Sequence, residues 1–218
     1  MLDGKMKLEI FDFDGTLVFT PLDSKENIKL YEDATGLPWK ITKRMAYDLT
    51  IEHGRPIGPR RGWWGRPETL QPPLVPDPCP ESLLNKPVFE RWKESKENPD
   101  VLTILMTGRH QGLRDCVFRI LDQLNILDVQ YTPEAPKGKQ YREADSKAVV
   151  YLMGQDGPKG GNSRKPHETF PWKMWVIEQF LDLHKSKEVE MWEDRDSHVK
   201  MFSEQSGLKG ATFTVNKV

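Results

Sequence analysis

The sequence predicts an α/β protein built around a Rossmann-like parallel β-sheet. Short apolar runs of strand length alternate with amphipathic segments of helical period, most regularly in residues 100–215. Several of these runs end in a glycine turn or in a group of polar residues. Because strands that alternate with helices favour a parallel sheet, we expect ligands to bind beyond the carboxyl ends of the strands.

The first predicted strand covers residues 7–13 and runs into an Asp-Gly-Thr turn. Short helices are expected at residues 24–34 and 40–47, and residues 56–87 are rich in proline, glycine and tryptophan. Proline lacks an N–H donor and fixes φ, so this run is predicted to be an irregular segment that packs on its tryptophans. We therefore expect residues 1–16 and 100–218 to form the core and residues 17–99 to form a cap-like insertion.

Regular alternation resumes after the insertion. A strand is predicted at residues 100–106, and apolar side chains then recur at helical spacing from 113 to 124. A short strand at 128–131 and a polar segment at 133–168, which includes a flexible loop, are expected next. The last predicted elements are a helix at 171–183 with Thr169 as its N-cap, a strand at 188–192, a helix at 197–206 and a strand at 211–215.

Composition narrows the class of protein. The 218-residue chain has a net charge of −1, which argues against a broad nonspecific nucleic-acid surface but leaves room for a local basic patch. No apolar run reaches the roughly 20 residues that span a bilayer, and the first residues lack the pattern of a signal peptide. We expect a cytoplasmic protein without membrane contact. Cys79 and Cys116 lie far apart and are expected to be reduced.

Polar side chains cluster where this architecture would place a site, at strand ends and helix beginnings: Asp12, Asp14, Thr107, Lys173, Glu193, Asp194 and Asp196. In chain order these residues lie in FDFDGTL, ILMTGR, FPWKMWVIEQFL and MWEDRDSH. The four segments together resemble the motifs of the haloacid dehalogenase-like (HAD) hydrolases. Each motif alone is weak, since an Asp-Gly turn or a charged loop is common, but the ordered set in a fitting strand context favours the functional interpretation.

The resemblance implies a chemistry for each residue. Asp12 would be the nucleophile that forms an aspartyl-phosphate, and Asp14 would be the general acid and base. Thr107 and Lys173 would hold phosphoryl oxygens. The resemblance also implies a Mg²⁺ ion, whose expected ligands are Asp12, Asp14, the Phe13 carbonyl and Asp194, with Glu193 or Asp196 assisting. Which of the last three acids binds the metal directly stays open, because Glu193 stands where paired aspartates are common.

A closer resemblance extends beyond these motifs. The segments FTPLDS, RRGWWGRPETL, TFPWKMWVIEQFL and MWEDRDSHVKMF resemble the HAD domain of Swiss Army Knife RNA repair proteins. This implies a phosphorylated nucleic-acid end as substrate. The candidate substrate-binding residues are Gly108, Arg109, Arg60, Arg61, Trp63 and Trp64. The arginines could hold backbone phosphates and the tryptophans could stack a base, although packing inside the insertion is the preferred interpretation of the tryptophans.

The sequence-level hypothesis is a phosphatase of nucleic-acid or nucleotide termini, with a slight preference for the 3′ end. A small-molecule or nucleotide phosphatase is the first alternative. A catalytically silent domain that binds nucleic-acid ends or a protein is the second, and a phosphoprotein phosphatase is the third. Phosphate release from end-phosphorylated oligonucleotides and from free nucleotides distinguishes the first alternative from the main hypothesis.

Overall fold

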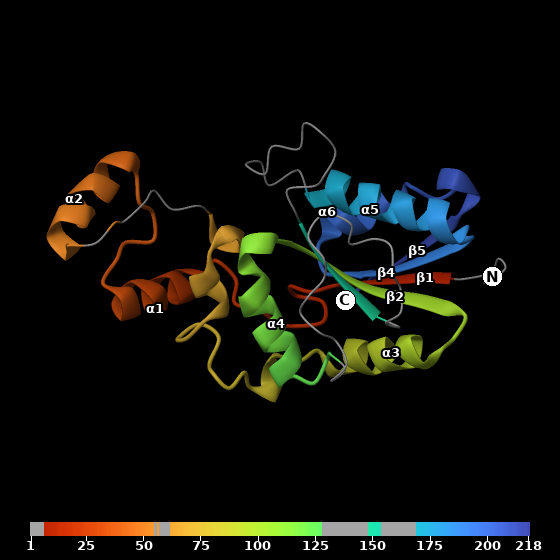
Figure 1. Ribbon diagram of the computed structural model, residues 1–218, viewed down its shortest axis with the longest axis horizontal. Coiled ribbons are helices and arrows are strands. Elements are labelled where there is room, and N and C mark those ends of the chain that lie inside the picture. Colours follow the sequence, from red (N-terminus) through yellow and green to blue (C-terminus); the bar gives the residue numbers. More distant parts are fainter. Residues whose placement is uncertain (1–6, 55, 57–61, 128–147, 154–168) are drawn as a thin grey trace.

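A computed structural model describes residues 7–54, 56, 62–127, 148–153 and 169–218. Within these residues the chain forms a five-stranded sheet with the order β3-β2-β1-β4-β5 (Figure 1). Every neighbouring pair of strands is parallel. The strands are β1 (Lys7–Asp12), β2 (Val101–His110), β3 (Ala148–Met153), β4 (Glu188–Glu193) and β5 (Thr212–Lys217). The predicted α/β fold class with a Rossmann-like parallel sheet is confirmed.

Helices cover both faces of this sheet, as Figure 1 shows for α3 (Lys86–Glu97) below it and for α5 (Thr169–His184) and α6 (Asp196–Ser203) above it. On one face, Trp92 of α3 packs with Phe11 and Leu105, together with apolar residues of α4 (Arg114–Gln123). On the other face, α5 and α6 pack on Ile10 and Met106. Because side chains alternate across a strand, neighbouring apolar residues of β1 and β2 serve opposite faces, which explains their near-continuous apolar sequences.

The region between β1 and α3 holds short helices. In Figure 1, α1 (Lys25–Thr35) and α2 (Lys43–His53) extend away from the sheet. The Ser24 and Thr42 side chains cap these two helices by accepting backbone N–H groups. Three 3₁₀ turns follow: η1 (Trp63–Gly65), η2 (Pro67–Leu70) and η3 (Glu81–Leu83). A small core of tyrosine, tryptophan and leucine side chains stabilises this region, namely Tyr31, Trp39, Trp63 and Leu74.

Two sequence expectations need correction. Residues 148–153, predicted to be part of a polar segment, form β3, which pairs with β2. Residues 86–97, for which no helix was predicted, form α3, and the buried Trp92 side chain anchors this helix against the sheet. The strand predicted at 128–131 and the flexible loop predicted within 133–168 lie outside the described residues.

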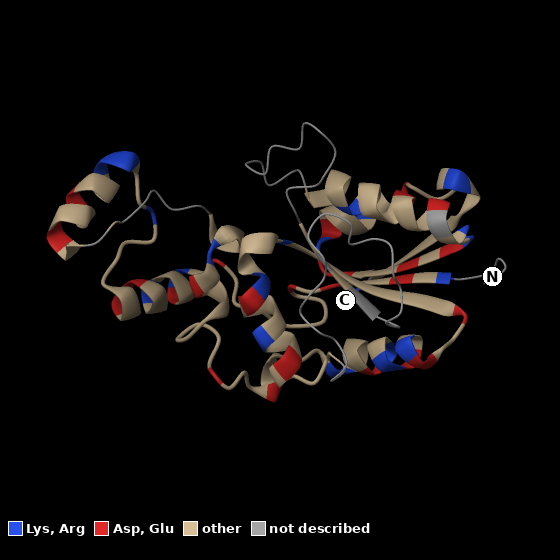
Figure 2. Cartoon of the chain, in the orientation of Figure 1, with Lys and Arg blue, Asp and Glu red and all other residues tan. Residues whose placement is uncertain are grey.

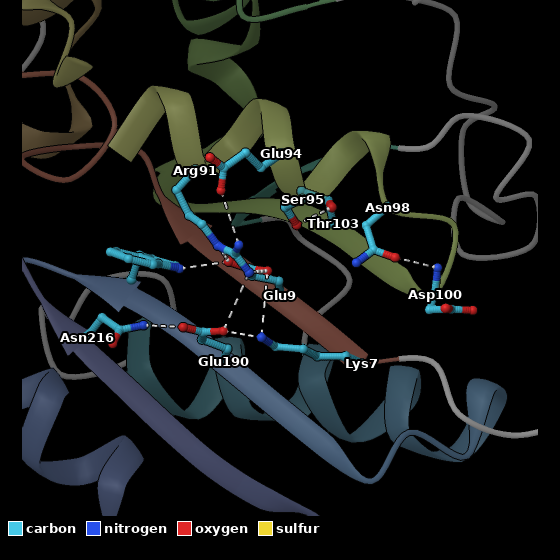
Figure 3. A network of polar contacts seen from close by, with 11 residues as sticks. Lys7, Glu9, Arg91, Glu94, Ser95, Asn98, Asp100, Thr103, Glu190 and Asn216 are labelled. Atoms are coloured by element: carbon cyan, nitrogen blue, oxygen red, sulfur yellow. Dashed lines mark hydrogen bonds and ion pairs between the residues drawn. The ribbon is translucent and has the colours of Figure 1, made fainter. Parts of the chain in front are cut away.

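A polar network links α3 to the sheet (Figure 3). The fully buried Glu9 of β1 accepts two hydrogen bonds from Arg91, of 2.7 Å and 2.8 Å, and one of 3.0 Å from the indole N–H of Trp192. Glu190 of β4 accepts from Asn216 and pairs with Lys7. A buried carboxylate is tolerated when its oxygens are paired in this way, so the network fixes the position of α3 on the sheet.

Among the described helices, none combines the length and apolar character needed to cross a membrane. Acidic and basic residues are intermixed along α1, whereas α2 carries Lys43 and Arg44 at its start and Asp48 and Glu52 further along (Figure 2).

Candidate active site

The sequence-predicted residues meet where β1, β2 and β4 end. Asp12 closes β1 and lies beside Met106 of β2, so Thr107 follows at the same edge of the sheet. Glu193 closes β4, and Asp194 is the next residue. Since parallel strands end at one edge, residues far apart in the sequence come together there. The region beyond these strand ends is therefore the candidate active site.

A buried lysine connects the two strands that carry the acids. The Lys173 ammonium lies 2.8 Å from an oxygen of Asp12 and 2.8 Å from an oxygen of Glu193. The Lys173 side chain is fully buried. Burial lowers the pKa of Lys173, but the two carboxylates outweigh this effect and leave the pKa above its ordinary value. The lysine is thus a fixed positive charge between Asp12 and Glu193.

The two carboxylates differ in their ionisation. Burial raises the pKa of Asp12 to about 7, although Lys173 opposes the shift. Burial also raises the pKa of Glu193, but Lys173, a hydrogen bond from His198 and the charge of Arg195 outweigh it and hold the pKa well below its usual range. An additional cation near Asp12 would favour the ionised, nucleophilic form of this carboxyl.

Asp14 is held by three donor residues from two parts of the chain, the end of β2 and the segment after β1. Arg109 donates from Nε and Nη2, with its shortest contact at 2.8 Å, in a charge-assisted pair. The hydroxyl of Thr20 donates to Asp14 at 2.7 Å, and that of Thr107 donates at 3.3 Å. The chain reaches Thr20 because it folds back after the turn, with a β-bridge between Asp14 and Val18. These contacts fix the orientation of the Asp14 carboxylate.

Asp194 has the environment expected of a metal ligand. Oxygens of Asp12, Glu193 and Asp194 lie within 4.8 Å of one another. The buried Oδ1 of Asp194 has no hydrogen-bond partner among the described residues. Burial and the charge of Glu193 raise the pKa of Asp194 to about 6. Unpaired carboxylate oxygen in a buried acidic cluster suits Mg²⁺, which prefers oxygen ligands, so the residues present fit this ion.

The turn after β1 makes room for Asp194. Gly15 has a φ of +75°, and a Cβ atom at this position would lie 2.4 Å from Asp194 Oδ2. Any side chain here would be strained by the backbone conformation and would also collide with the carboxylate. The Asp-Gly-Thr sequence of the turn therefore has two functions: it ends β1 and it lets Asp194 approach Asp12.

The other predicted metal ligands lie in different surroundings. Both oxygens of Glu193 are engaged, by Lys173 and His198 on one side and by Arg195 on the other. Asp196 is exposed and pairs with Lys217. The Phe13 carbonyl accepts a hydrogen bond of 2.9 Å from the amide of Val18, which leaves it a second lone pair.

The predicted substrate-binding residues have diverse environments. Arg109 is buried and its guanidinium contacts Asp14, and Gly108 lies so close to the start of α5 that a Cβ would be 2.9 Å from Thr169. Trp63 is buried in the small core of the insertion, whereas Trp64 is 41% exposed. Arg60 and Arg61 lie outside the described residues.

Sequence reasoning missed several contacts. It did not identify Thr20 as a partner of Asp14, nor Glu193 as the anchor of Lys173. It also did not identify the contact between His198 and Glu193, where the Nδ1 atom lies 3.2 Å from the carboxylate. One feature of the fourth motif could have indicated this role of Glu193. It stands where an aspartate is common, and its longer side chain can reach a lysine on the neighbouring helix.

The fold and the ordered acids, hydroxyl and lysine define a HAD-type α/β domain. The family model for HAD domain family 1 in Swiss Army Knife RNA repair proteins matches residues 53–208. The match covers more than half of the chain, so the chain belongs to this family. The resemblance inferred from the motifs is confirmed.

Two solved structures were found to be similar. One is the structure of a Pnkp1/Rnl/Hen1 complex, with 16% identity, a TM-score of 0.44, and coverage of 99% of this chain and 47% of that chain. The other is a haloacid dehalogenase-like hydrolase from Burkholderia xenovorans LB400, with 9% identity, a TM-score of 0.39, and coverage of 97% of this chain and 81% of that chain. The chain thus spans about half the length of the chain it matches in the complex. Sequence identities and TM-scores this low do not support any conclusion about function.

Proposed function

We propose that the chain is a Mg²⁺-dependent phosphomonoesterase that removes phosphate from nucleic-acid ends through an aspartyl-phosphate on Asp12. The observation that carries this proposal is the arrangement around Asp12: a buried carboxylate at a strand end, 2.8 Å from the Lys173 ammonium and within 4.8 Å of the other acids. A phosphate dianion repels an anionic nucleophile, so the nucleophile needs fixed positive charge beside it. This arrangement supplies that charge.

The proposed metal site consists of Asp12, Asp194 and the Phe13 carbonyl. Mg²⁺ bound there would offset the negative charge of the nucleophile and the substrate. Asp194 is preferred over Glu193 and Asp196, because the first has an unpartnered buried oxygen while the other two are already paired. Glu193 is instead assigned to hold Lys173 in place.

The chain's own residues then account for the two half-reactions. A carboxylate oxygen of Asp12 attacks phosphorus, a new O–P bond forms, and the P–O bond to the leaving alcohol breaks. For this first half-reaction Asp14 has to carry a proton in place of its ion pair with Arg109, and it gives that proton to the leaving oxygen. Asp14 next takes a proton from water, whose oxygen attacks the phosphoryl group and restores Asp12 with release of inorganic phosphate. Arg109 and Thr20 hold Asp14 in the position that this proton transfer requires.

Thr107 and Lys173 are proposed to contact the phosphoryl oxygens. Thr107 is the first residue after the apolar part of β2, and its hydroxyl is 3.3 Å from Asp14. Lys173 is already bound to Asp12, so its charge stands beside the atom that attacks. Preorganised donors of this type contribute about 3–4 kcal/mol each to transition-state stabilisation in other enzymes.

The substrate class is supported by the family, whose members are described as HAD domains of RNA repair proteins. A phosphorylated RNA end is therefore the proposed substrate, and the slight preference for a 3′ end is kept. Neither α1 nor α2 is uniformly basic, because both helices also carry acidic residues (Figure 2). This suits recognition of an end better than binding along a duplex.

The test is a comparison of matched substrates. Phosphate release is measured from 3′- and 5′-phosphorylated RNA and DNA oligonucleotides and from free nucleotides, with Mg²⁺ and with EDTA. The proposal predicts Mg²⁺-dependent release from an end-phosphorylated oligonucleotide that is lost in Asp12→Asn. Much faster release from mononucleotides would make the protein a nucleotide phosphatase. Oligonucleotide binding by both proteins without release from any ester would make it a silent binding domain.

A further inference from the structure

Two consecutive tryptophans in η1 have opposite environments. Trp63 is 3% exposed, packs 4.7 Å from the Trp39 ring, and donates its indole N–H to the carbonyl of Pro21 at 2.7 Å. Trp64 is 41% exposed and belongs to no buried cluster among the described residues. Burial in the small core therefore explains Trp63 but not Trp64.

Trp64 is held at the edge of the active site by the residue that holds Asp14. The guanidinium carbon of Arg109 lies 4.8 Å from the centre of the Trp64 ring. Arg109 also donates to the Trp64 carbonyl at 3.3 Å and to the hydroxyl of Thr69 at 2.8 Å, while its other nitrogens bind Asp14. The Arg109 guanidinium thus contacts both the Trp64 ring and the Asp14 carboxylate.

The residues on each side of Trp64 are also held in place. On the sheet side, the His110 ring nitrogen lies 3.4 Å from the carbonyl of Gly65. On the other side, buried Trp63 anchors the preceding residue in the small core. A rigid aromatic surface loses little entropy when it binds a ligand, so an exposed but fixed indole is well suited to stacking.

We propose that Trp64 is the stacking platform for the nucleobase of the phosphorylated end nucleotide. This inference rests on the proposed function and extends it, because it assigns the residue that recognises the nucleoside. A base is a flat π surface, and in a nucleotide it is joined through one sugar to the phosphate that Asp12 would attack. Stacking tolerates every base, so Trp64 makes the enzyme require a base while leaving it indifferent to sequence.

The charge of Arg109 couples this platform to the catalytic acid. A cation over an indole ring is attracted to its π face, so Arg109 orients the ring while it orients Asp14. A base stacked on Trp64 would therefore place its own terminal phosphate close to Asp14. A phosphorylated peptide lacks the base and would gain nothing from this surface.

The inference can be tested with Trp64→Ala, Trp64→Phe and the matched control Tyr47→Ala. Tyr47 is an aromatic side chain on α2 that is 70% exposed and lies away from the site. The substrates are an end-phosphorylated oligonucleotide and the same oligonucleotide with an abasic terminal nucleotide. For the base-bearing end we expect Trp64→Ala to lower kcat/KM by about 5- to 150-fold, mostly through KM, which is the range that base stacking is worth. The abasic end should change less than twofold, and Trp64→Phe and Tyr47→Ala should stay near wild type.

Equal losses on both ends would overturn the inference, because they would assign Trp64 a purely structural role. Unchanged kcat/KM on the base-bearing end would overturn it as well, as would a phosphopeptide that is the preferred substrate. Binding of the fluorescein-labelled oligonucleotide to Asp12→Asn, with and without Trp64→Ala, gives a readout that needs no turnover. If wild type releases no phosphate but Trp64→Ala still weakens binding of the base-bearing end alone, the proposed function fails and the stacking site stands.

Discussion

Replacing Lys173 with methionine should destabilise the protein strongly, because it removes the charge between two buried carboxylates. The ammonium lies 2.8 Å from Asp12 and 2.8 Å from Glu193, and its side chain is fully buried. At an effective dielectric constant of 20 each contact gains about 6 kcal/mol, most of which is offset by desolvation of the three charges. Loss of one partner from a buried ion pair costs about 3–5 kcal/mol, and methionine preserves most of the volume. We expect the free energy of unfolding to fall by that amount.

The assay is urea unfolding and thermal melting at pH 7.5 in EDTA. A loss of about 3–5 kcal/mol corresponds to a fall in Tm of about 6–20 °C for a chain of this size. Lys29→Met is the matched control: Lys29 pairs with Asp33 at 2.7 Å on the surface of α1, and its removal should cost less than about 1 kcal/mol. Without the ammonium, the pKa of both carboxyls would rise, so the loss should shrink as pH falls. Equal Tm values for Lys173→Met and wild type would refute the buried ion pair.

Three further outcomes are expected. Gly15→Ala should abolish the rise in Tm that Mg²⁺ causes and lower turnover at least tenfold, because the added Cβ would lie 2.4 Å from Asp194. The control is Gly36→Ala: this glycine has a φ of +65° and open space around it, so the variant should lose only about 1–2 kcal/mol of stability and keep its turnover. The pKa of Asp194 is raised to about 6 from 3.8, so ionisation of this carboxyl lowers the stability of the folded protein as pH rises through this range. In EDTA, Asp194→Asn should therefore be more stable than wild type by about 1 kcal/mol at pH 8, after allowance for solvent screening, and equally stable near pH 4. A less stable variant at pH 8 would contradict this assignment. Arg91→Ala should lower the free energy of unfolding by about 2–4 kcal/mol, because the buried Glu9 loses two hydrogen bonds, and it should leave kcat of the folded protein unchanged. Urea unfolding and a kinetic assay check these two expectations.

The hydrophobic pattern of the sequence predicted four of the five strands of the sheet. The apolar runs that became β1 and β2 are buried on both faces, while β4 and β5 alternate buried with more exposed residues, and both patterns are local to the strand. The strand β3 was missed because its six residues, AVVYLM, were included in the polar segment that surrounds them, although the run itself is apolar and of strand length. The helix α3 was missed because it is highly charged and carries Pro87, although proline in a first turn is compatible with a helix.

The candidate site was predictable to the extent that it depends on strand ends. Asp12, Thr107 and Glu193 follow from topology, since parallel strands place their carboxyl ends together. The partners of these residues depend on how the chain returns after each strand. Thr20 reaches Asp14 only because of the turn at Gly15, and no pattern in the sequence reports that contact. The difference between Trp63 and Trp64 likewise depends on which ring enters the small core.

The central claim is that Asp12 is the nucleophile, and trapping the phosphoryl group tests it most directly. Wild type and Asp12→Asn are mixed with an oligonucleotide that carries a ³²P-labelled terminal phosphate in the presence of Mg²⁺ and quenched in acid within milliseconds. The labelled protein is then digested and mapped by mass spectrometry. The account predicts label on the peptide that contains Asp12 in wild type and none in the variant. Label on another residue, or phosphate release by Asp12→Asn at the wild-type rate, would contradict it.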